Sequence, residues 1–269
     1  MGPLAAFAGK SILITGASDG IGAELARQLA GPGIDLVLAA RNTEKLQETE
    51  KQCEARGAKA LAIRCDVGVE ADCRALVDRA VSAFGRIDIL VNNAGVSGHA
   101  YLEEVEDFAW YEAMMRVNFF GTLWCTRYAL PHLRRRQGLV VGISSLAGKV
   151  GIPGRTAYSP SKFAQAGFLE ALRVELMGSG VDVTVVYPGI VATGIRVNGY
   201  GADGRAAGTS GLKEDKAMSV EECARQIVEA MASRRRELVM TTRGKLGMWL
   251  KLIAPRLVDR MALAALKKE

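Results

Sequence analysis

The chain has 269 residues, of which 49% are hydrophobic and 24% charged, as expected for one sizeable globular domain or two small ones. Its formal net charge is +6 at pH 7, but residues 241–269 hold seven basic and two acidic side chains, so residues 1–240 are nearly neutral. A nearly neutral body argues against nucleic acid as the main ligand, because nucleic-acid binding depends on clustered basic residues.

The N-terminal sequence MGPLAAFAGK has neither the basic start nor the long apolar stretch of a signal peptide. No apolar run elsewhere approaches the roughly 18 residues that a membrane span requires. The five cysteines form no CxxC pair, and with only two histidines in the chain a structural zinc site is not expected. We therefore expect a cytoplasmic protein with free thiols and no bound metal.

Short apolar runs alternate with helix-length amphipathic segments along the chain. The apolar runs predict strands at residues 11–16, 34–41, 59–67, 86–95, 138–145, 181–189 and 237–240. The segments between them predict helices at residues 22–31, 43–57, 70–84, 107–136, 157–178 and 219–232. Such alternation implies right-handed crossovers, and strands that are apolar throughout are buried on both faces. The pattern predicts a single α/β domain over residues 1–240, with a doubly wound, mostly parallel seven-stranded sheet.

The first junction between strand and helix carries the glycine-rich turn TGASDGIG, residues 15–22. Gly16 permits a sharp turn, Gly20 permits close approach of a pyrophosphate, and Gly22 lets the helix pack on the strand. Backbone amides at the start of a helix then face the anion. The turn therefore predicts a dinucleotide site, to which Ser18, Asp19 and Ile21 also belong.

The end of the second strand favours NADP over NAD as the cofactor. Sites of this type that bind NAD usually place an acidic residue there to hold the ribose 2′-hydroxyl. Here the sequence is Ala39-Ala40-Arg41, followed by Asn42. The Arg41 guanidinium can pair with a 2′-phosphate. The alternative is that Arg41 merely faces solvent at the start of a helix.

A tyrosine and a lysine lie four residues apart in the segment YSPSK, so on a helix Tyr158 and Lys162 share one face. Pro160 lacks an N–H and fits only a first helical turn, which puts Tyr158 at the helix start. An ammonium group favours a neighbouring phenolate, so Lys162, helped by a cationic nicotinamide, is expected to lower the pKa of Tyr158. The pair predicts a proton-transfer device.

Two further segments stand apart from the regular pattern. Residues 194–219 hold six glycines and almost no periodicity, and are either a disordered insertion or a flexible substrate loop. Residues 241–269 form a basic amphipathic extension, read as two short helices broken at Pro255. This extension either covers the substrate cleft or a subunit contact, or it lies on an anionic membrane surface.

Five separated motifs together resemble the compact form of the short-chain dehydrogenase/reductase family. They are TGxxxGxG at 15–22, NNAG at 92–95, VNFFG at 117–121 with Asn118, Ser145 thirteen residues before Tyr158 of YxxxK, and PG at 188–189. The resemblance covers residues 10 to about 240 and implies an NADP-dependent oxidoreductase. It also implies a homodimer or homotetramer that pairs the helices at 112–136 and 157–178.

The resemblance implies a catalytic set of Asn118, Ser145, Tyr158 and Lys162. It assigns the adenine to Asp66 and Val67, the border of the cofactor to Asn93, Ala94 and Gly95, and the nicotinamide to Pro188, Gly189, Ile190 and Thr193. Asp19 departs from the family, which often has serine there, and its carboxylate is expected to weaken NADP binding slightly. The alternative to a catalytic role is, for Ser145, a cap at the end of its strand and, for Asn118, a buried structural amide.

The leading functional hypothesis is NADPH-dependent reduction of a carbonyl, or oxidation of the alcohol. Tyr158 would act as the general acid, Ser145 would hydrogen-bond the carbonyl oxygen, and Asn118 would anchor a water. The sequences around Ser145 and Tyr158 resemble those of the hydroxysteroid dehydrogenase and retinol reductase branches of the family. A bulky apolar ketone (steroid-, retinoid- or 3-oxoacyl-like) is therefore expected as the small-molecule substrate. The alternatives are a catalytically idle NADPH-binding regulator, and an epimerase or dehydratase of the extended branch, whose larger C-terminal domain is missing here.

Overall fold

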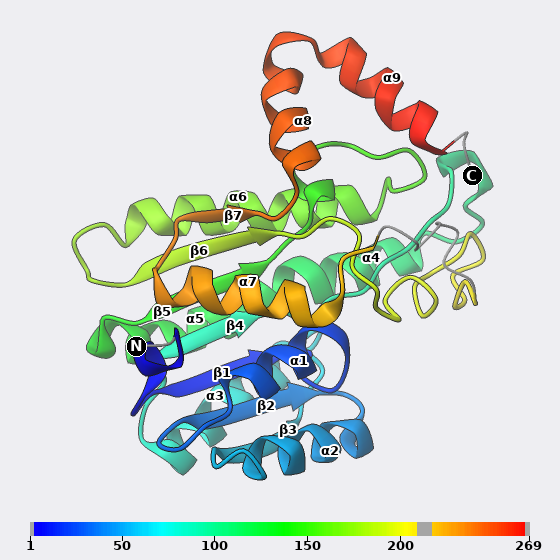
Figure 1. Cartoon of the computed structure of the whole chain (residues 1–269). Coiled ribbons are helices and arrows are strands. Elements are labelled where there is room, and N and C mark those ends of the chain that lie inside the picture. Colours follow the sequence, from blue (N-terminus) through cyan, green and yellow to red (C-terminus); the bar gives the residue numbers. More distant parts are fainter. Residues whose placement is uncertain (1–2, 209–216, 267–269) are drawn as a thin grey trace.

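The computed structural model describes residues 3–208 and 217–266, which build one parallel sheet with helices on both faces (Figure 1). The strands are β1 (Ser11–Thr15), β2 (Asp35–Ala40), β3 (Lys59–Arg64), β4 (Ile89–Asn92), β5 (Leu139–Ile143), β6 (Asp182–Tyr187) and β7 (Glu237–Val239). Their order across the seven-stranded sheet is β3-β2-β1-β4-β5-β6-β7, and every neighbouring pair is parallel. The predicted fold class is confirmed.

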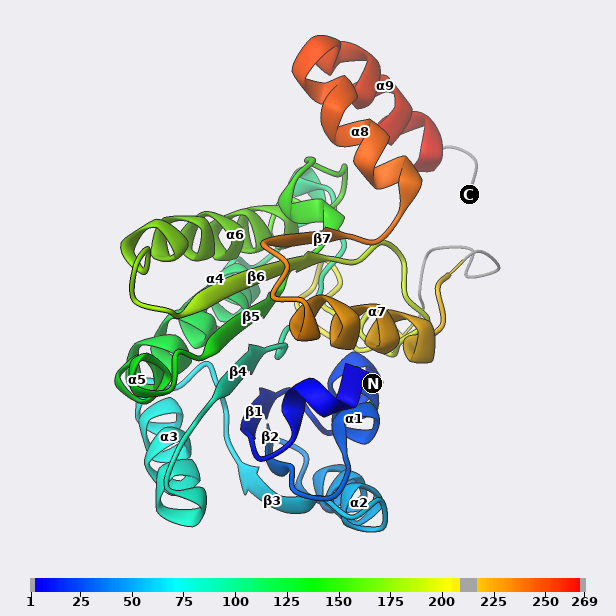
Figure 2. The same ribbon diagram turned by 60° about the vertical axis from the view of Figure 1, so that its left-hand side comes forward.

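Two layers of helices cover the sheet (Figure 2). One layer contains α1 (Gly20–Leu29), α2 (Thr43–Glu54) and α7 (Val220–Ala232). The other contains α3 (Glu70–Phe84), α5 (Gly121–Arg136) and α6 (Tyr158–Glu175), with the short α4 (Ala109–Met115) before α5. The central strands β1, β4 and β5 are buried along their whole length, because apolar side chains pack against both of their faces.

The strand order creates a switch point beside β1, which pairs with β2 on one side and with β4 on the other. Successive crossovers leave this strand in opposite directions, so a crevice opens beyond the carboxyl ends of β1 and β4. Open α/β sheets bind ligands at such a point. A ligand site is therefore expected among the turns that follow β1, β2, β4, β5 and β6.

The ends of most predicted elements agree with the structure to within three residues, and two of the differences fall near this crevice. The strand predicted at 59–67 ends at Arg64, because Asp66 turns the chain by accepting hydrogen bonds from the Gly68 amide on its Oδ1 and the Val69 amide on its carbonyl, both at 2.9 Å. The helix predicted at 107–136 is divided into α4, a π-helical turn (Arg116–Phe120) and α5. A local pattern of apolar residues does not reveal such a π turn.

The segment predicted to be flexible, 194–219, lies partly outside the described residues, which exclude 209–216. Its first part, residues 194–208, contains turns rather than a helix or an extended strand. The Tyr200 amide donates to the Ser97 carbonyl and the His99 amide to the Tyr200 carbonyl, both at 2.9 Å. The Tyr200 ring also stacks on the Trp110 ring, with centroids 5.7 Å apart. This part of the segment is therefore anchored to the loop that follows β4.

After β7 the chain leaves the body as two helices, α8 (Thr242–Ile253) and α9 (Pro255–Leu266), which project beyond the sheet (Figures 1 and 2). Thr241 caps α8 by accepting a hydrogen bond from the Gly244 amide at 3.0 Å. Pro255 starts a new helix because its ring prevents α8 from continuing. We call α8 and α9 together the C-terminal hairpin.

Candidate active site

A cavity of about 860 Å³ lies at the carboxyl edge of the sheet and runs from the glycine-rich turn to the C-terminal hairpin. All the cofactor-binding and catalytic residues predicted from the sequence line it, with two exceptions. The two exceptions are Gly22 and Asn118. Segments far apart in the sequence thus meet around one space of a size suited to a dinucleotide and a small substrate.

The glycine-rich turn fits an approaching pyrophosphate. Gly16 and Gly20 have φ values of +67° and +52°, a region that side chains disfavour. A Cβ at Gly22 would lie 2.2 Å from the Gly16 carbonyl oxygen, so this position accepts only glycine. The amide of Asn93 holds the turn in place, because its Nδ2 donates to the carbonyls of Thr15 at 2.9 Å and Gly16 at 3.1 Å. Asn93 therefore supports the turn as well as bordering the cavity.

A carboxylate occupies the start of α1. Asp19 caps this helix by accepting a hydrogen bond from the Gly20 amide at 2.7 Å, and its other oxygen pairs with Lys45 Nζ at 2.6 Å. The hydrogen bond from Lys45 and, more weakly, that from Gly20 lower the pKa of Asp19 below its ordinary value. The sequence indicated the negative charge of Asp19 but not its partner Lys45, which lies in the first turn of α2.

The adenosine end of the cavity is formed by the turns after β2 and β3. Arg41 is exposed beside Asn42, whose Oδ1 caps α2 by accepting from the Lys45 amide at 2.9 Å. Asp66 and Val67 line the cavity next to them. Among residues 3–208 and 217–266, no acidic side chain lines the cavity at the end of β2, as the sequence predicted.

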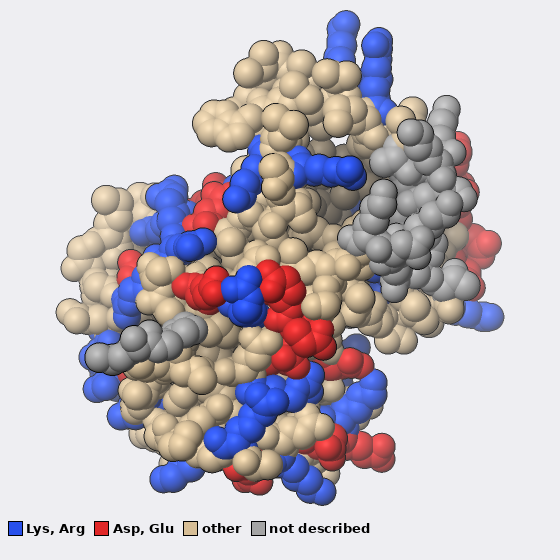
Figure 3. Space-filling model, viewed as in Figure 1, with Lys and Arg blue, Asp and Glu red and all other residues tan. Residues whose placement is uncertain are grey.

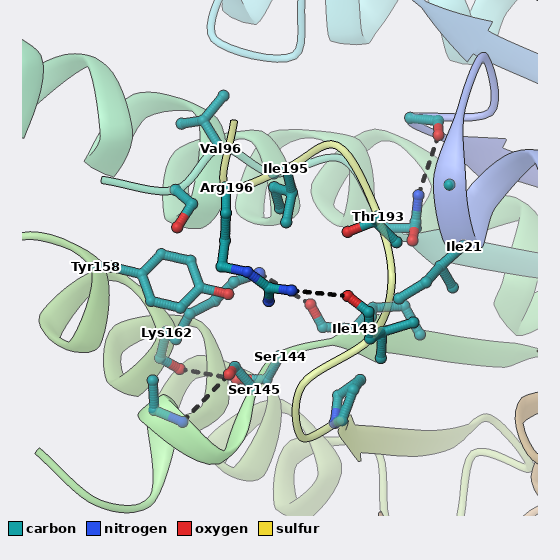
Figure 4. Close-up of a pocket in the computed structure, with 18 of the residues that line it drawn as sticks. Ile21, Val96, Ile143, Ser144, Ser145, Tyr158, Lys162, Thr193, Ile195 and Arg196 are labelled. Atoms are coloured by element: carbon teal, nitrogen blue, oxygen red, sulfur yellow. Dashed lines mark hydrogen bonds between the residues drawn. The ribbon is translucent and has the colours of Figure 1, made fainter. Parts of the chain in front are cut away.

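Tyr158 is the first residue of α6, and Pro160 lies in its first turn. Burial raises the pKa of Tyr158, while the hydrogen bond with Ser145 and the positive charges of Arg155 and Arg196 act in the opposite direction. Ser145 itself accepts a hydrogen bond from the Ala147 amide at 3.2 Å, so it also caps the short turn after β5. Figure 4 shows Ser145 and Tyr158 converging on one part of the cavity.

Lys162 lies one turn further along α6 and is 3% exposed. Its Nζ donates to the Ile143 carbonyl at 2.9 Å and to Gln165 Oε1 at 3.3 Å, and lies 6.0 Å from the centroid of the Tyr158 ring. Burial lowers the pKa of Lys162 to about 8. The pKa of Tyr158 is raised because burial outweighs the nearby positive charges of the two arginines. That Lys162 lowers this pKa beside a cationic nicotinamide stays a prediction.

Asn118 lies in the π-helical turn and is fully buried. Its Nδ2 donates to the Val96 carbonyl and to Ser161 Oγ, both at 2.9 Å, and its Oδ1 accepts from the Val96 amide at 2.8 Å. The side chain therefore clamps the loop after β4 to α6. This arrangement matches the alternative of a buried structural amide, and the side chain does not face the cavity.

Several residues that line the cavity were not predicted. Arg155 donates from Nη1 to Ser97 Oγ at 2.7 Å, and Arg196 donates from Nη2 to the Val191 carbonyl at 3.3 Å. Figure 4 shows the Arg196 side chain extending past Tyr158 into the cavity. His99, an exposed residue of the loop after β4, also lines the cavity. Arg155 lies three residues before Tyr158, with its guanidinium 5.8 Å from the centroid of that ring, whereas Arg196 reaches Tyr158 only through the tertiary fold.

Comparison with known proteins agrees with this geometry. The family described as short chain dehydrogenase matches residues 10–200. The chain is 36% identical to 11-beta-hydroxysteroid dehydrogenase A of Sesamum indicum over 258 residues, 94% of this chain and 74% of that protein. It is 34% identical to dehydrogenase/reductase SDR family member 7B of Bos taurus over 266 residues, 96% of this chain and 82% of that protein.

Two solved structures share the fold over nearly the whole chain. A short chain dehydrogenase/reductase from Burkholderia phymatum in complex with NAD superposes with a TM-score of 0.81 at 27% identity, covering 94% of this chain and 96% of that one. An alcohol dehydrogenase from Thermococcus sibiricus complexed with 5-hydroxy-NADP gives a TM-score of 0.74 at 25% identity, covering 86% and 95%. The chain belongs to the short-chain dehydrogenase family of nicotinamide-dependent oxidoreductases that act on CH–OH groups.

Proposed function

We propose that this protein is an NADPH-dependent carbonyl reductase, and an alcohol dehydrogenase in reverse, that acts on a bulky apolar ketone. The observation that carries the proposal is the meeting of Ser145 and Tyr158 in a cavity that also holds the glycine-rich turn. The nicotinamide would supply the hydride when bound. The chain itself has to bind the carbonyl, deliver a proton and keep water away.

In the reductive direction Tyr158 is the general acid. Its raised pKa keeps the phenol protonated at neutral pH, so the proton is available for the developing alkoxide. Ser145 orients the carbonyl oxygen by a hydrogen bond that strengthens as negative charge develops. Lys162, held by Ile143 and Gln165, keeps a positive charge at the cavity floor below its pKa of about 8 and can hydrogen-bond the nicotinamide ribose. Asn118 acts by positioning the Val96 loop.

The preference for NADPH rests on the turn after β2. An exposed guanidinium at Arg41, with no carboxylate at the end of that strand, suits a 2′-phosphate better than a free hydroxyl. Lys45 reduces the effect of the Asp19 carboxylate by pairing with it at 2.6 Å, which leaves Arg41 to attract the more negative cofactor. Asp66 lines the same end of the cavity, where the family resemblance assigns it to the adenine.

The substrate proposal rests on the opposite end of the cavity. Its lining there is largely aliphatic and includes Leu146, Val150, Ile152, Val258 and Met261. Such a lining favours a large apolar ketone of the steroid, retinoid or 3-oxoacyl type over a small polar one. The hydroxysteroid dehydrogenase names of similar proteins are in keeping with this class. Since the five cysteines are free and buried, we further propose that the protein works in a reducing compartment such as the cytoplasm.

The test is a panel of ketones and aldehydes of increasing size, assayed with NADPH and NADH by loss of the reduced-nicotinamide absorbance. We expect turnover with NADPH that improves with apolar bulk. Tyr158→Phe should lower this turnover by about 10²- to 10⁴-fold while NADPH still binds. Absence of turnover on every carbonyl, despite tight NADPH binding, would instead favour the catalytically idle regulator.

A further inference from the structure

The C-terminal hairpin exposes a cluster of large apolar side chains. Seven of them are exposed, namely Leu246, Trp249, Leu252, Ile253, Leu257, Met261 and Leu263. Leu252 and Ile253, at the tip of α8, are 77% and 83% exposed. Leu246, Trp249 and Ile253 follow helical spacing, so they form one outward face of α8. Clustered exposure of this kind marks an interaction surface.

The opposite side of the hairpin already has its partners in the body. Lys251 Nζ donates to the Lys149 carbonyl at 2.8 Å and lies 5.2 Å from the centroid of the Phe163 ring. Val258 of α9 is buried and lines the cavity, as do Gly244 and Gly247 of α8. The inward side of the hairpin therefore covers the cavity, and the outward apolar face is not needed for that purpose.

The hairpin is also basic. Its residues 242–266 contain five cations against the single carboxylate of Asp259. Lys251 faces the body and Arg243 lines the cavity, whereas Lys245, Arg256 and Arg260 are exposed. Figure 3 shows the projecting part of the molecule as mostly uncharged surface, with Lys and Arg side chains reaching outward from its top. Apolar side chains flanked by cations are the combination that an anionic lipid surface attracts.

We propose that the C-terminal hairpin docks this protein on an anionic membrane surface, with its outward apolar face at the boundary between headgroups and acyl chains. The proposed contact is a peripheral one, and none of the described helices is long and apolar enough to span a bilayer. A second copy of the chain is the competing occupant. Two such hairpins facing each other would bring like charges together, which makes an anionic surface the better electrostatic match.

The position of the hairpin gives this contact a role in catalysis. Because Val258 and Met261 line the cavity, docking brings the cavity wall to the lipid boundary. An apolar ketone dissolved in the bilayer would then reach Tyr158 without crossing water. This second step rests on the proposed reductase function, whereas the docking itself requires neither cofactor nor turnover.

The test is sedimentation of the full-length protein with vesicles of phosphatidylcholine alone, or of phosphatidylcholine mixed with phosphatidylserine. We expect binding to the mixed vesicles that weakens as salt is added. Leu252→Ser with Ile253→Ser should lower the partition at least roughly tenfold. Arg256→Gln with Arg260→Gln should lower it by roughly 10- to 30-fold at low salt.

Matched controls are available on the body of the protein. Val174→Ser with Met177→Ser removes two exposed apolar side chains near the end of α6, and Arg134→Gln with Arg135→Gln removes two exposed cations from α5. Neither pair should change the partition. Trp249, 69% exposed, supplies a probe, because its fluorescence should shift to the blue on mixed vesicles, and Trp249→Phe should abolish that shift.

Three results would overturn the proposal. The first is failure of the mixed vesicles to sediment the wild-type protein at low salt. The second is equal partition of the wild-type protein and the Leu252→Ser, Ile253→Ser variant. The third combines two observations: light scattering gives a smaller particle for that variant than for the wild-type protein, and the wild-type protein binds no vesicles. The outward apolar face would then be a subunit contact. Because these readouts use no ketone, failure of the reductase proposal would be seen separately in the substrate panel.

Discussion

Lys162 gives a quantitative prediction about stability, because it is an ionisable group held where water cannot reach it. Its side chain is 3% exposed, and burial lowers its pKa from the ordinary 10.5 to about 8. Between these values the unfolded chain binds more protons at this site than the folded protein does. The free energy of unfolding therefore rises with pH across this window, by about 3 kcal/mol in all.

The perturbation is Lys162→Met, which keeps the length of the side chain and removes its charge. Between about pH 7 and about pH 10, we expect the free energy of unfolding of the wild-type protein to rise by up to about 3 kcal/mol more than that of the variant. The variant leaves the Ile143 carbonyl without its donor, a cost of about 1–3 kcal/mol. That cost is the same at both pH values, so it cancels in the comparison.

The assay is urea unfolding of both proteins at the two pH values, without cofactor, monitored by far-UV circular dichroism. Other groups that titrate in this range, Tyr158 among them, are present in both proteins and also cancel. Parallel pH profiles for the two proteins would contradict this prediction, because Lys162 would then be no harder to protonate in the folded protein than in the unfolded one.

Four further predictions concern the cofactor, the proton and the assembly. Tyr158→Phe should leave the dissociation constant for NADPH unchanged within about twofold while abolishing most turnover, and loss of NADPH binding would contradict a purely acid–base role. Arg41→Ala should weaken NADPH by about 10- to 100-fold in fluorescence titrations and leave NADH unchanged, whereas equal losses would make Arg41 structural. Asp19→Ser keeps a helix cap but removes the carboxylate paired with Lys45, so it should tighten NADPH and not NADH, and a weaker NADPH complex would refute this. Light scattering should give a homodimer or homotetramer for the wild-type protein, and a wild-type monomer would contradict this. Phe120→Glu should give a smaller particle, because it puts a charge into the partly exposed aromatic surface that Phe120 forms with Trp124.

The architecture and the elements that bear the site follow from local features of the amino-acid sequence. Alternating apolar strands and amphipathic helices allow few arrangements other than a doubly wound parallel sheet, because βαβ crossovers are right-handed. The glycines of the first turn and the spacing of Tyr158 and Lys162 are also local features. Pro160 is a local feature as well, and it predicts the start of α6 because its missing N–H is tolerated only in a first turn.

The electrostatics of the site, in contrast, depend on contacts between segments that are distant in the sequence. Whether Lys162 lowers the pKa of Tyr158, or both groups are governed by burial, depends on how closely other segments pack around them. Lys45 offsets Asp19 although the two lie 26 residues apart, and Arg196 reaches Tyr158 from a loop that follows β6. The amphipathic pattern of residues 241–269 likewise could not say which apolar side chains cover the cavity and which face outward. Local spacing determines secondary structure, whereas burial and charge pairing depend on distances that exist only after the chain has folded.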